Sequence, residues 1–132
     1  MQFDIYVNYN RKCREAFHYY EQHLGGKIAM IQTFAQMPNA ADIPADRRDD
    51  IVHARIEIGS TTLMGADIPN AETMRSAYLT LRLSSIAEAE KVYGSLTDGG
   101  EIFMEMKETH YAKRFAMLRD KFGANWMLLC EE

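Results

Sequence analysis

Alternating polar and apolar residues at the start of the chain predict a strand over residues 3–9. From residue 10 the apolar positions follow at spacings of three and four, which predicts a helix that runs to about Leu24. Asn10 would be its N-cap, and Gly25 would end it. Alternation then returns and predicts three more strands, over residues 27–36, 50–58 and 60–65. The first half therefore has the order βαβββ.

The second half repeats this order, because GGKIAM at residues 25–30 returns as GGEIFM at residues 99–104. A strand is predicted over residues 77–83, then a helix after Ser85, where Ser85 and Glu88 have capping-box spacing. Gly99 would end this helix, and three strands would follow, over residues 101–107, 115–119 and 125–130. A solenoid needs three or more stacked repeats. Two copies instead predict one α+β domain, residues 1–132, of two pseudo-symmetric βαβββ modules, about 1–66 and 76–132.

Two segments lie outside the repeat. Residues 67–75 contain Pro69 and Asn70 and form the predicted linker between the modules. Residues 37–49 contain two prolines and lead into a cluster of charged residues. Such a long connection is usually a solvated loop or a lid, and we favour the solvated loop.

Composition and charge narrow the possible partners. The chain has 132 residues, of which 47% are hydrophobic and 26% charged, as is typical of a globular domain. Its net charge of −4, without a basic run, is unlike that of a nucleic-acid binder. We expect no membrane partner and a cytoplasmic location, because neither a signal peptide nor a long apolar stretch is visible. Two cysteines, Cys13 and Cys130, are expected to be buried thiols.

Two βαβββ modules in one short chain resemble the vicinal oxygen chelate superfamily, which includes glyoxalases, bleomycin-resistance proteins and extradiol dioxygenases. Several segments are similar to its PhnB-like branch: YVNYN at residues 6–10, the glycine pair after the first helix, His53-Ala54, LMG at residues 63–65 and FAMLRDKFGANW at residues 115–126. The resemblance implies a curved mixed sheet with a concave cleft, and a homodimer. Some relatives carry a methyltransferase label connected with ubiquinone synthesis, but this chain has no glycine-rich loop between a strand and a helix for such a cofactor.

The metal enzymes of that superfamily place four His or Glu ligands in the cleft. By resemblance, these positions fall on Asp4, Met64 (or Leu63), Tyr78 and Met127. Borderline and hard divalent cations prefer imidazole or carboxylate ligands over thioethers and phenols. The expectation is therefore a protein without the standard metal and without another cofactor, while a non-standard metal site stays open.

Strand parity predicts which side chains face the cleft, because residues two apart share a face. The apolar residues of the first strand of each module would pack under the helices, which leaves the polar residues on the opposite face. In the strand over residues 50–58, three polar residues alternate with the apolar set. The predicted cleft residues from these strands are Asp4, Tyr6, Asn8, His53, Arg55, Glu57, Tyr78, Thr80 and Arg82.

Each candidate has a functional and a structural interpretation. His53 could be a general base, although a single histidine on a strand more often hydrogen-bonds a neighbour. Arg55 and Arg82 could bind a carboxylate or phosphate, or they could form internal pairs with Glu57 and Asp4.

The remaining candidate ligand contacts are Met64, Met127, His110, Tyr111 and Trp126. Tyr111 and Trp126 could stack on a flat ligand, but Trp126 could equally belong to the core or to a dimer interface. His110 and Tyr111 lie in a predicted loop that could gate the cleft.

Two functions remain open, ahead of a purely structural dimer. The first is a metal-independent protein that binds a small organic molecule, similar to the bleomycin-resistance members. The second is an enzyme of glyoxalase or lyase type, in which His53, Asp4 and Glu57 supply proton transfer or a non-standard metal site. The missing metal ligands favour binding, and the clustered polar groups favour catalysis.

Overall fold

The computed structural model describes residues 1–131, and the chain divides into two compact units between Glu72 and Thr73. The first unit contains β1 (Ile5–Tyr9), α1 (Cys13–His23), β2 (Lys27–Thr33), the short 3-10 helices η1 (Phe34–Gln36), η2 (Ala40–Asp42) and η3 (Ala45–Arg47), β3 (Ile51–Ile58) and β4 (Thr61–Asp67). The second contains β5 (Leu79–Arg82), α2 (Ile86–Thr97), β6 (Glu101–Thr109), β7 (Ala112–Arg119) and β8 (Asn125–Cys130). Both units have the predicted order βαβββ, so the α+β prediction is confirmed.

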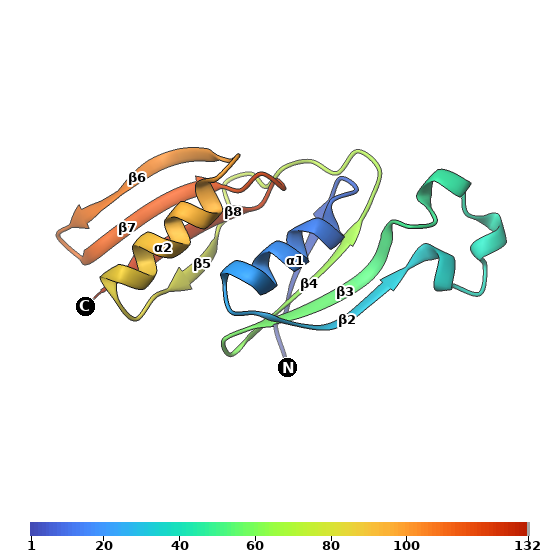
Figure 1. Cartoon of the computed structure of the whole chain (residues 1–132), viewed down its shortest axis with the longest axis horizontal. Coiled ribbons are helices and arrows are strands. Elements are labelled where there is room, and N and C mark those ends of the chain that lie inside the picture. The colour runs from blue at the N-terminus through green and yellow to red at the C-terminus, as the bar shows by residue number, and fades with distance from the viewer. Residues whose placement is uncertain (132) are drawn as a thin grey trace. The chain divides into compact units, whose positions relative to one another are not determined.

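The two units share one topology. The strand order is β1-β4-β3-β2 in the first sheet and β5-β8-β7-β6 in the second. In each, the first strand pairs in parallel with the last, and the other pairs are antiparallel. α1 lies across one face of the first sheet and α2 across one face of the second (Figure 1). The predicted mixed sheet is thus formed as two hydrogen-bonded sheets of four strands each.

The core of the first unit lies between its sheet and α1. Tyr9 packs edge-on against Phe17 of α1, and its hydroxyl lies 3.2 Å from the hydroxyl of Tyr20. Gly65 on β4 permits this packing, because a Cβ atom there would lie 2.9 Å from Cζ of Phe17. The parity prediction is therefore confirmed for β1: its apolar residues face the helix.

The start of α1 differs from the prediction. Asn10 is not the N-cap; Lys12 occupies that position and its side chain makes no capping hydrogen bond. The backbone N–H of Cys13 instead donates to Oδ1 of Asp67, at 2.9 Å, and the N–H of Ile51 donates to Oδ2 at 2.8 Å. Asp67 is only 3% exposed. One buried carboxylate therefore joins the end of β4, the start of α1 and the start of β3.

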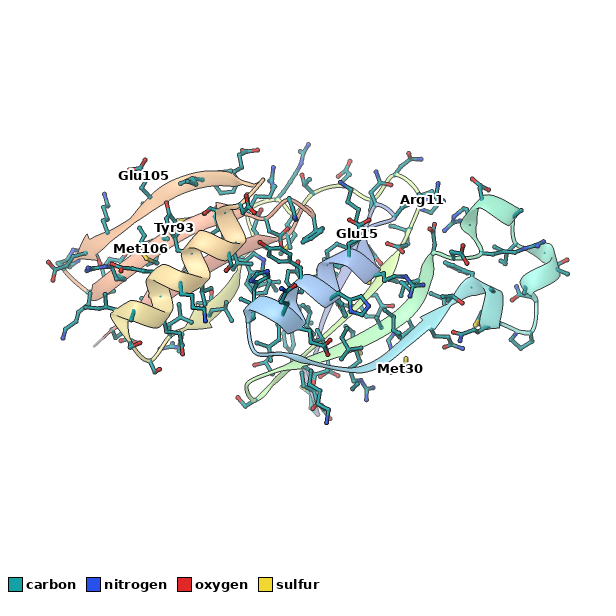
Figure 2. All side chains as sticks on the ribbon, in the orientation of Figure 1. Arg11, Glu15, Met30, Tyr93, Glu105 and Met106 are labelled. Carbon is teal, nitrogen blue, oxygen red and sulfur yellow. The ribbon has the colours of Figure 1, made fainter. Side chains whose placement is uncertain are left out.

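The long connection after β2 is a series of turns. β2 ends at Thr33, not at residue 36 as predicted, because residues 34–36 form η1. Arg11 in the β1–α1 connection (Figure 2) binds the carboxylate of Asp50 through Nε and donates through Nη2 to the carbonyl of Asp46. Arg14 donates to the carbonyl of Asp49 at 3.3 Å. The connection is exposed, as predicted, and these arginines attach it to the start of α1.

The core of the second unit lies between its sheet and α2. Leu79, Leu118, Trp126 and Leu128 are buried together with apolar residues of α2. Ser85 caps α2 as predicted, accepting a hydrogen bond from the N–H of Glu88 at 3.0 Å. Neither this helix nor any other in residues 1–131 is long and apolar enough to cross a membrane.

Candidate functional site

Each sheet has a face opposite its helix, and we call it the open face. On the first sheet, one row of directly paired residues crosses all four strands on this face: Tyr6, Met64, Arg55 and Met30. Met30 marks the β2 end of this row (Figure 2). This register shows whether Met64 or Leu63 lies on the open face. Met64 lies on the open face, whereas Leu63 is buried on the helix side.

Tyr6 and His53 form a pair on this open face. The hydroxyl oxygen of Tyr6 and Nδ1 of His53 are 3.1 Å apart, which is a hydrogen-bond distance. Their rings stack at 5.7 Å between centroids, with 26° between the planes. Tyr6 is 47% exposed, so the pair is accessible to a ligand. The pair joins a predicted ligand contact, Tyr6, to a predicted catalytic residue, His53, from strands that are not neighbours.

Burial, and then the charge that an ionised Cys13 would carry, raise the pKa of the Tyr6 phenol. The hydroxyl of Tyr6 therefore keeps its proton at neutral pH. If that proton is directed to Nδ1 of His53, the histidine ring presents Nε2–H to the solvent; if Nδ1 carries the proton, Nε2 is an acceptor. Nε2 makes no hydrogen bond within residues 1–131 in either case. A ligand with either a donor or an acceptor could be bound there.

The predicted catalytic residues His53, Asp4 and Glu57 do not lie together on the first sheet. Glu57 is four residues from His53 along β3, about 13 Å away at the rise of a strand. Asp4 precedes β1 and is exposed, toward the same end of the sheet as Glu57. The structure thus brings His53 together with Tyr6 and not with these two carboxylates. Asn8 is exposed on β1, next to Tyr6 on the same face.

Arg55 and Arg82 have different surroundings. Arg55 is exposed and makes no ion pair among the described residues, so the internal pair with Glu57 is not formed. Arg82 binds Glu131 at 2.7 Å, and both side chains are exposed. Arg55 is therefore a cation without an ion-pair partner among residues 1–131, on the open face of the first sheet and two residues from His53.

The open face of the second sheet includes three rows of paired residues. One consists of Thr80, Met127, Met117 and Met104, directly paired across β5, β8, β7 and β6. The next contains Asn125, Arg119 and Glu101, with Tyr78 at the β5 edge. The third contains Arg82, Leu129, Phe115 and Lys107. The row with Met127 is therefore rich in thioethers, and Arg119 and Arg82 place guanidinium groups in the rows on either side of it.

Arg119 was not among the predicted site residues. Its Nε donates to Oδ1 of Asn125 at 3.0 Å, and its Nη2 donates to the carbonyl of Met74 at 2.8 Å. Its guanidinium carbon lies 5.2 Å from the centroid of the Phe103 ring. Phe103 in turn contacts Tyr78 edge-on, at 6.4 Å between centroids. Arg119 is two residues from Met117 on β7, so strand parity could have placed both side chains on one face. Phe103 could not be placed in this way, because it lies in an irregular part of β6 where parity fails.

Trp126 requires a correction. It is 2% exposed, on the helix side of the sheet, and its Nε1 donates to Oδ2 of Asp120 at 2.8 Å. It therefore belongs to the core, which was the structural alternative, and does not lie on the open face.

His110 and Tyr111 form the turn between β6 and β7, where the Tyr111 ring packs edge-on against Phe115. They lie at a hairpin end and not in a longer loop.

The four positions that correspond to superfamily metal ligands hold one carboxylate, two thioethers and one phenol, from Asp4, Met64, Met127 and Tyr78. This donor set does not fit a divalent cation that prefers imidazole and carboxylate ligands. Within residues 1–131, no three His, Cys, Asp or Glu side chains gather in a way that could hold a metal ion.

A protein-family model described as 3-demethylubiquinone-9 3-methyltransferase matches residues 2–129. The chain belongs to this family. Protein YjdN of Escherichia coli is 28% identical to it, over 97% of this chain and 94% of YjdN. Among solved structures, PA1353 of Pseudomonas aeruginosa is 38% identical, with a TM-score of 0.88 over 99% of this chain and 98% of PA1353.

Two more distant structures share the fold. A PhnB protein of Bacillus cereus, described as a putative 3-demethylubiquinone-9 3-methyltransferase, has a TM-score of 0.85 at 20% identity, over 98% of this chain and 99% of that protein. The fosfomycin resistance protein FosX of Listeria monocytogenes has a TM-score of 0.69 at 7% identity, over 98% of this chain and 90% of FosX. The family member described here is therefore PhnB-like and has the fold of the vicinal oxygen chelate superfamily, as its sequence indicated.

Proposed function

We propose that this protein binds a small polar organic molecule on the open face of its first sheet, without a standard metal site. The observation that carries the proposal is the Tyr6–His53 pair: two aromatic hydrogen-bonding groups held 3.1 Å apart on an exposed face. Arg55 adds a cation without an ion-pair partner among residues 1–131. An arginine of this kind binds carboxylate and phosphonate groups well. The ligand class is therefore a small anion that also carries a hydroxyl or carbonyl group.

Comparison with FosX supports the ligand class but not the metal. The FosX structure is a complex with Mn(II) and 1S,2S-dihydroxypropylphosphonic acid, which is a small hydroxylated anion. This chain shares the fold of FosX. At the positions that the superfamily resemblance assigns to metal ligands, it holds one carboxylate, two thioethers and one phenol. Binding through the hydrogen-bonding pair and Arg55 requires no metal.

The family description names methyl transfer. The segments that connect strands to helices favour small-molecule binding over methyl transfer. A nucleotide-like cofactor is usually held by a glycine-rich turn between a strand and a helix. Here residues 10–12 connect β1 to α1 and residues 83–85 connect β5 to α2, and neither segment contains a glycine.

The test is a titration followed by two-dimensional amide NMR, in buffer with EDTA. The probes are glycolate, pyruvate and hydroxymethylphosphonate, each with one acidic group and one hydroxyl or carbonyl group. We expect at least one of them to cause saturable shifts in the first unit, which His53→Ala and Arg55→Gln abolish. Arg82→Gln is the matched control, since it removes an exposed arginine that is already paired with Glu131. Shifts that need added metal, or that persist in both variants, would contradict the proposal.

Metal content gives an independent check. The protein is purified gently, incubated with zinc, nickel, manganese or iron, desalted and measured by elemental analysis. We expect less than one tenth of an equivalent to be retained. Near-stoichiometric metal that is lost in His53→Ala would overturn the metal-free proposal. Homodimerisation stays a prediction, which light scattering coupled to size-exclusion chromatography would check.

A second candidate function is proton transfer next to a carbonyl, and the Tyr6–His53 pair is the observation that favours it. In the tautomer in which Nδ1 of His53 donates to the Tyr6 oxygen, Nε2 carries a lone pair that could take a proton from a substrate, and the Tyr6 hydroxyl fixes the ring. The assay follows exchange of the methyl protons of pyruvate with deuterium from solvent. Catalysis that falls at least tenfold in His53→Ala would favour an enzyme; the uncatalysed rate in the wild type would leave binding as the function.

A further inference from the structure

Arg119 on the open face of the second sheet is held in one orientation. Two of its donors are bonded, through Nε to Asn125 and through Nη2 to the carbonyl of Met74. The acceptor Asn125 is itself fixed: it is 2% exposed, and its Nδ2 donates to the carbonyls of Met74 and Ala77 at 3.2 and 3.1 Å. The guanidinium carbon lies over the Phe103 ring, 5.2 Å from its centroid. Little side-chain freedom is left to lose when a ligand binds.

The charge of Arg119 is not neutralised within the described residues. Both of its hydrogen-bond acceptors are neutral, and none of the ion pairs among residues 1–131 includes it. Glu101 is directly opposite on β6 but forms no ion pair with it. A guanidinium has five N–H groups, and its two Nη atoms together match the two oxygens of a carboxylate. Hydrogen atoms on both Nη atoms of Arg119 remain for such a ligand.

Beside this guanidinium lies an apolar surface of adaptable side chains. Met104, Met117 and Met127 are half-buried neighbours in one row across three strands. Methionine adapts to irregular apolar shapes and makes favourable contacts with aromatic rings. Phe103 is 41% exposed and adds an aromatic edge to this surface. A ligand that reaches from Arg119 to the methionine row needs an acidic group at one end and a flat or flexible apolar body.

We propose that the open face of the second sheet binds an amphipathic carboxylate, with its acid group on Arg119 and its apolar body against Phe103 and the methionine row. This proposal rests on residues of the second unit alone and does not depend on the Tyr6–His53 pair. A purely structural role for Arg119, attaching the segment before β5 to the sheet, needs only the bonds to Asn125 and Met74. It does not require an exposed Phe103 or the row of thioethers beside it.

The test uses 2-naphthoate as the probe and isothermal titration calorimetry as the measurement. Two control molecules separate the parts of the proposal: 2-naphthamide keeps the apolar body without the charge, and acetate keeps the charge without the body. We expect saturable binding of 2-naphthoate and at least tenfold weaker binding of both controls. No binding of 2-naphthoate to the wild type, or equal binding of the amide, would overturn the proposal.

Variants then locate the bound molecule. Arg119→Lys keeps a charge but loses the bidentate geometry, so we expect at least tenfold weaker binding. Arg114→Gln is the matched control, because Arg114 lies on the same strand and pairs with Glu90 of α2 on the other face. It should leave the affinity unchanged. Equal affinity in the Arg119→Lys variant would contradict the proposal.

Two further variants keep the test decisive if Arg119→Lys fails to fold. Glu101→Gln removes the carboxylate opposite Arg119, so we expect severalfold tighter binding; Phe103→Leu removes an exposed ring and should weaken binding severalfold. If neither variant changes the affinity, the proposal is wrong. His53→Ala should have no effect on 2-naphthoate, which distinguishes failure of this site from failure of the first.

Discussion

Asp67 is a position where replacing one carboxylate oxygen should cost substantial stability. Its two carboxylate oxygens accept hydrogen bonds from the backbone N–H groups of Cys13 and Ile51, at 2.9 and 2.8 Å. Asp67→Asn preserves the shape of the side chain but replaces one acceptor oxygen with an NH2 group. One of the two N–H groups then faces a donor in a site with almost no access to water.

The expected loss follows from those contacts. A buried N–H without an acceptor costs about 1–3 kcal/mol. Replacing a carboxylate at the first turn of α1 removes a further stabilisation of about 0.3–1 kcal/mol from the helix dipole. Together these predict that the free energy of unfolding falls by about 1–4 kcal/mol. For a chain of this size, a loss of that order lowers Tm by roughly 10 °C.

The assay is urea unfolding at pH 7, followed by far-ultraviolet circular dichroism, together with calorimetry for Tm. Asp42→Asn is the matched control, because Asp42 lies exposed in the long connection after β2. It should change the free energy of unfolding by less than about 0.5 kcal/mol. A loss of under 1 kcal/mol for Asp67→Asn would show that the carboxylate does not fix the start of α1 as described.

Three further changes test the core and the buried thiol. Gly65→Ala should destabilise the fold by about 1–3 kcal/mol in urea unfolding, because its Cβ would lie 2.9 Å from the Phe17 ring; a neutral result would mean that the ring moves aside. Asp120→Ala removes the acceptor of Trp126 Nε1 and of two backbone N–H groups. Unfolding followed by tryptophan fluorescence should therefore occur at a clearly lower urea concentration, and an unchanged urea midpoint would refute this. Burial, and then the charge of a nearby carboxylate, raise the pKa of the Cys13 thiol. The stability that the neutral thiol contributes is therefore complete below the pKa of an unfolded thiol, about 8.5. That stability is lost as the pH rises above this value. Cys13→Ala should therefore lose less stability than the wild type between pH 8 and 10.5 in urea unfolding, and parallel pH profiles would contradict the assignment.

The sequence predicts the elements well because their signals are local. Alternation and three-to-four spacing give all eight strands and both α-helices, and the positive φ of Gly25 and Gly99 matches their predicted place after the helices. The cap of α1 could not be predicted in this way. Its acceptor is Asp67, which lies 54 residues from Cys13 along the chain. A local pattern carries no information on such a partner.

The candidate site is predictable only in part, for a similar reason. Parity correctly places Tyr6 and His53 on one face, but it does not state how far Glu57 lies from them. Parity also fails where a strand is irregular. β6 has register shifts around Met104, so the position of Phe103 beside Arg119 follows only from the three-dimensional pairing.

The matching registers of the two sheets have an evolutionary consequence. Tyr6 and Thr80 occupy equivalent places, as do Met64 and Met127, and Arg55 and Met117. If the halves arose by duplication, an arginine in one copy and a methionine in the other mark where their chemistry diverged on an unchanged backbone. A single chain could thereby acquire two unlike recognition surfaces, one on each sheet.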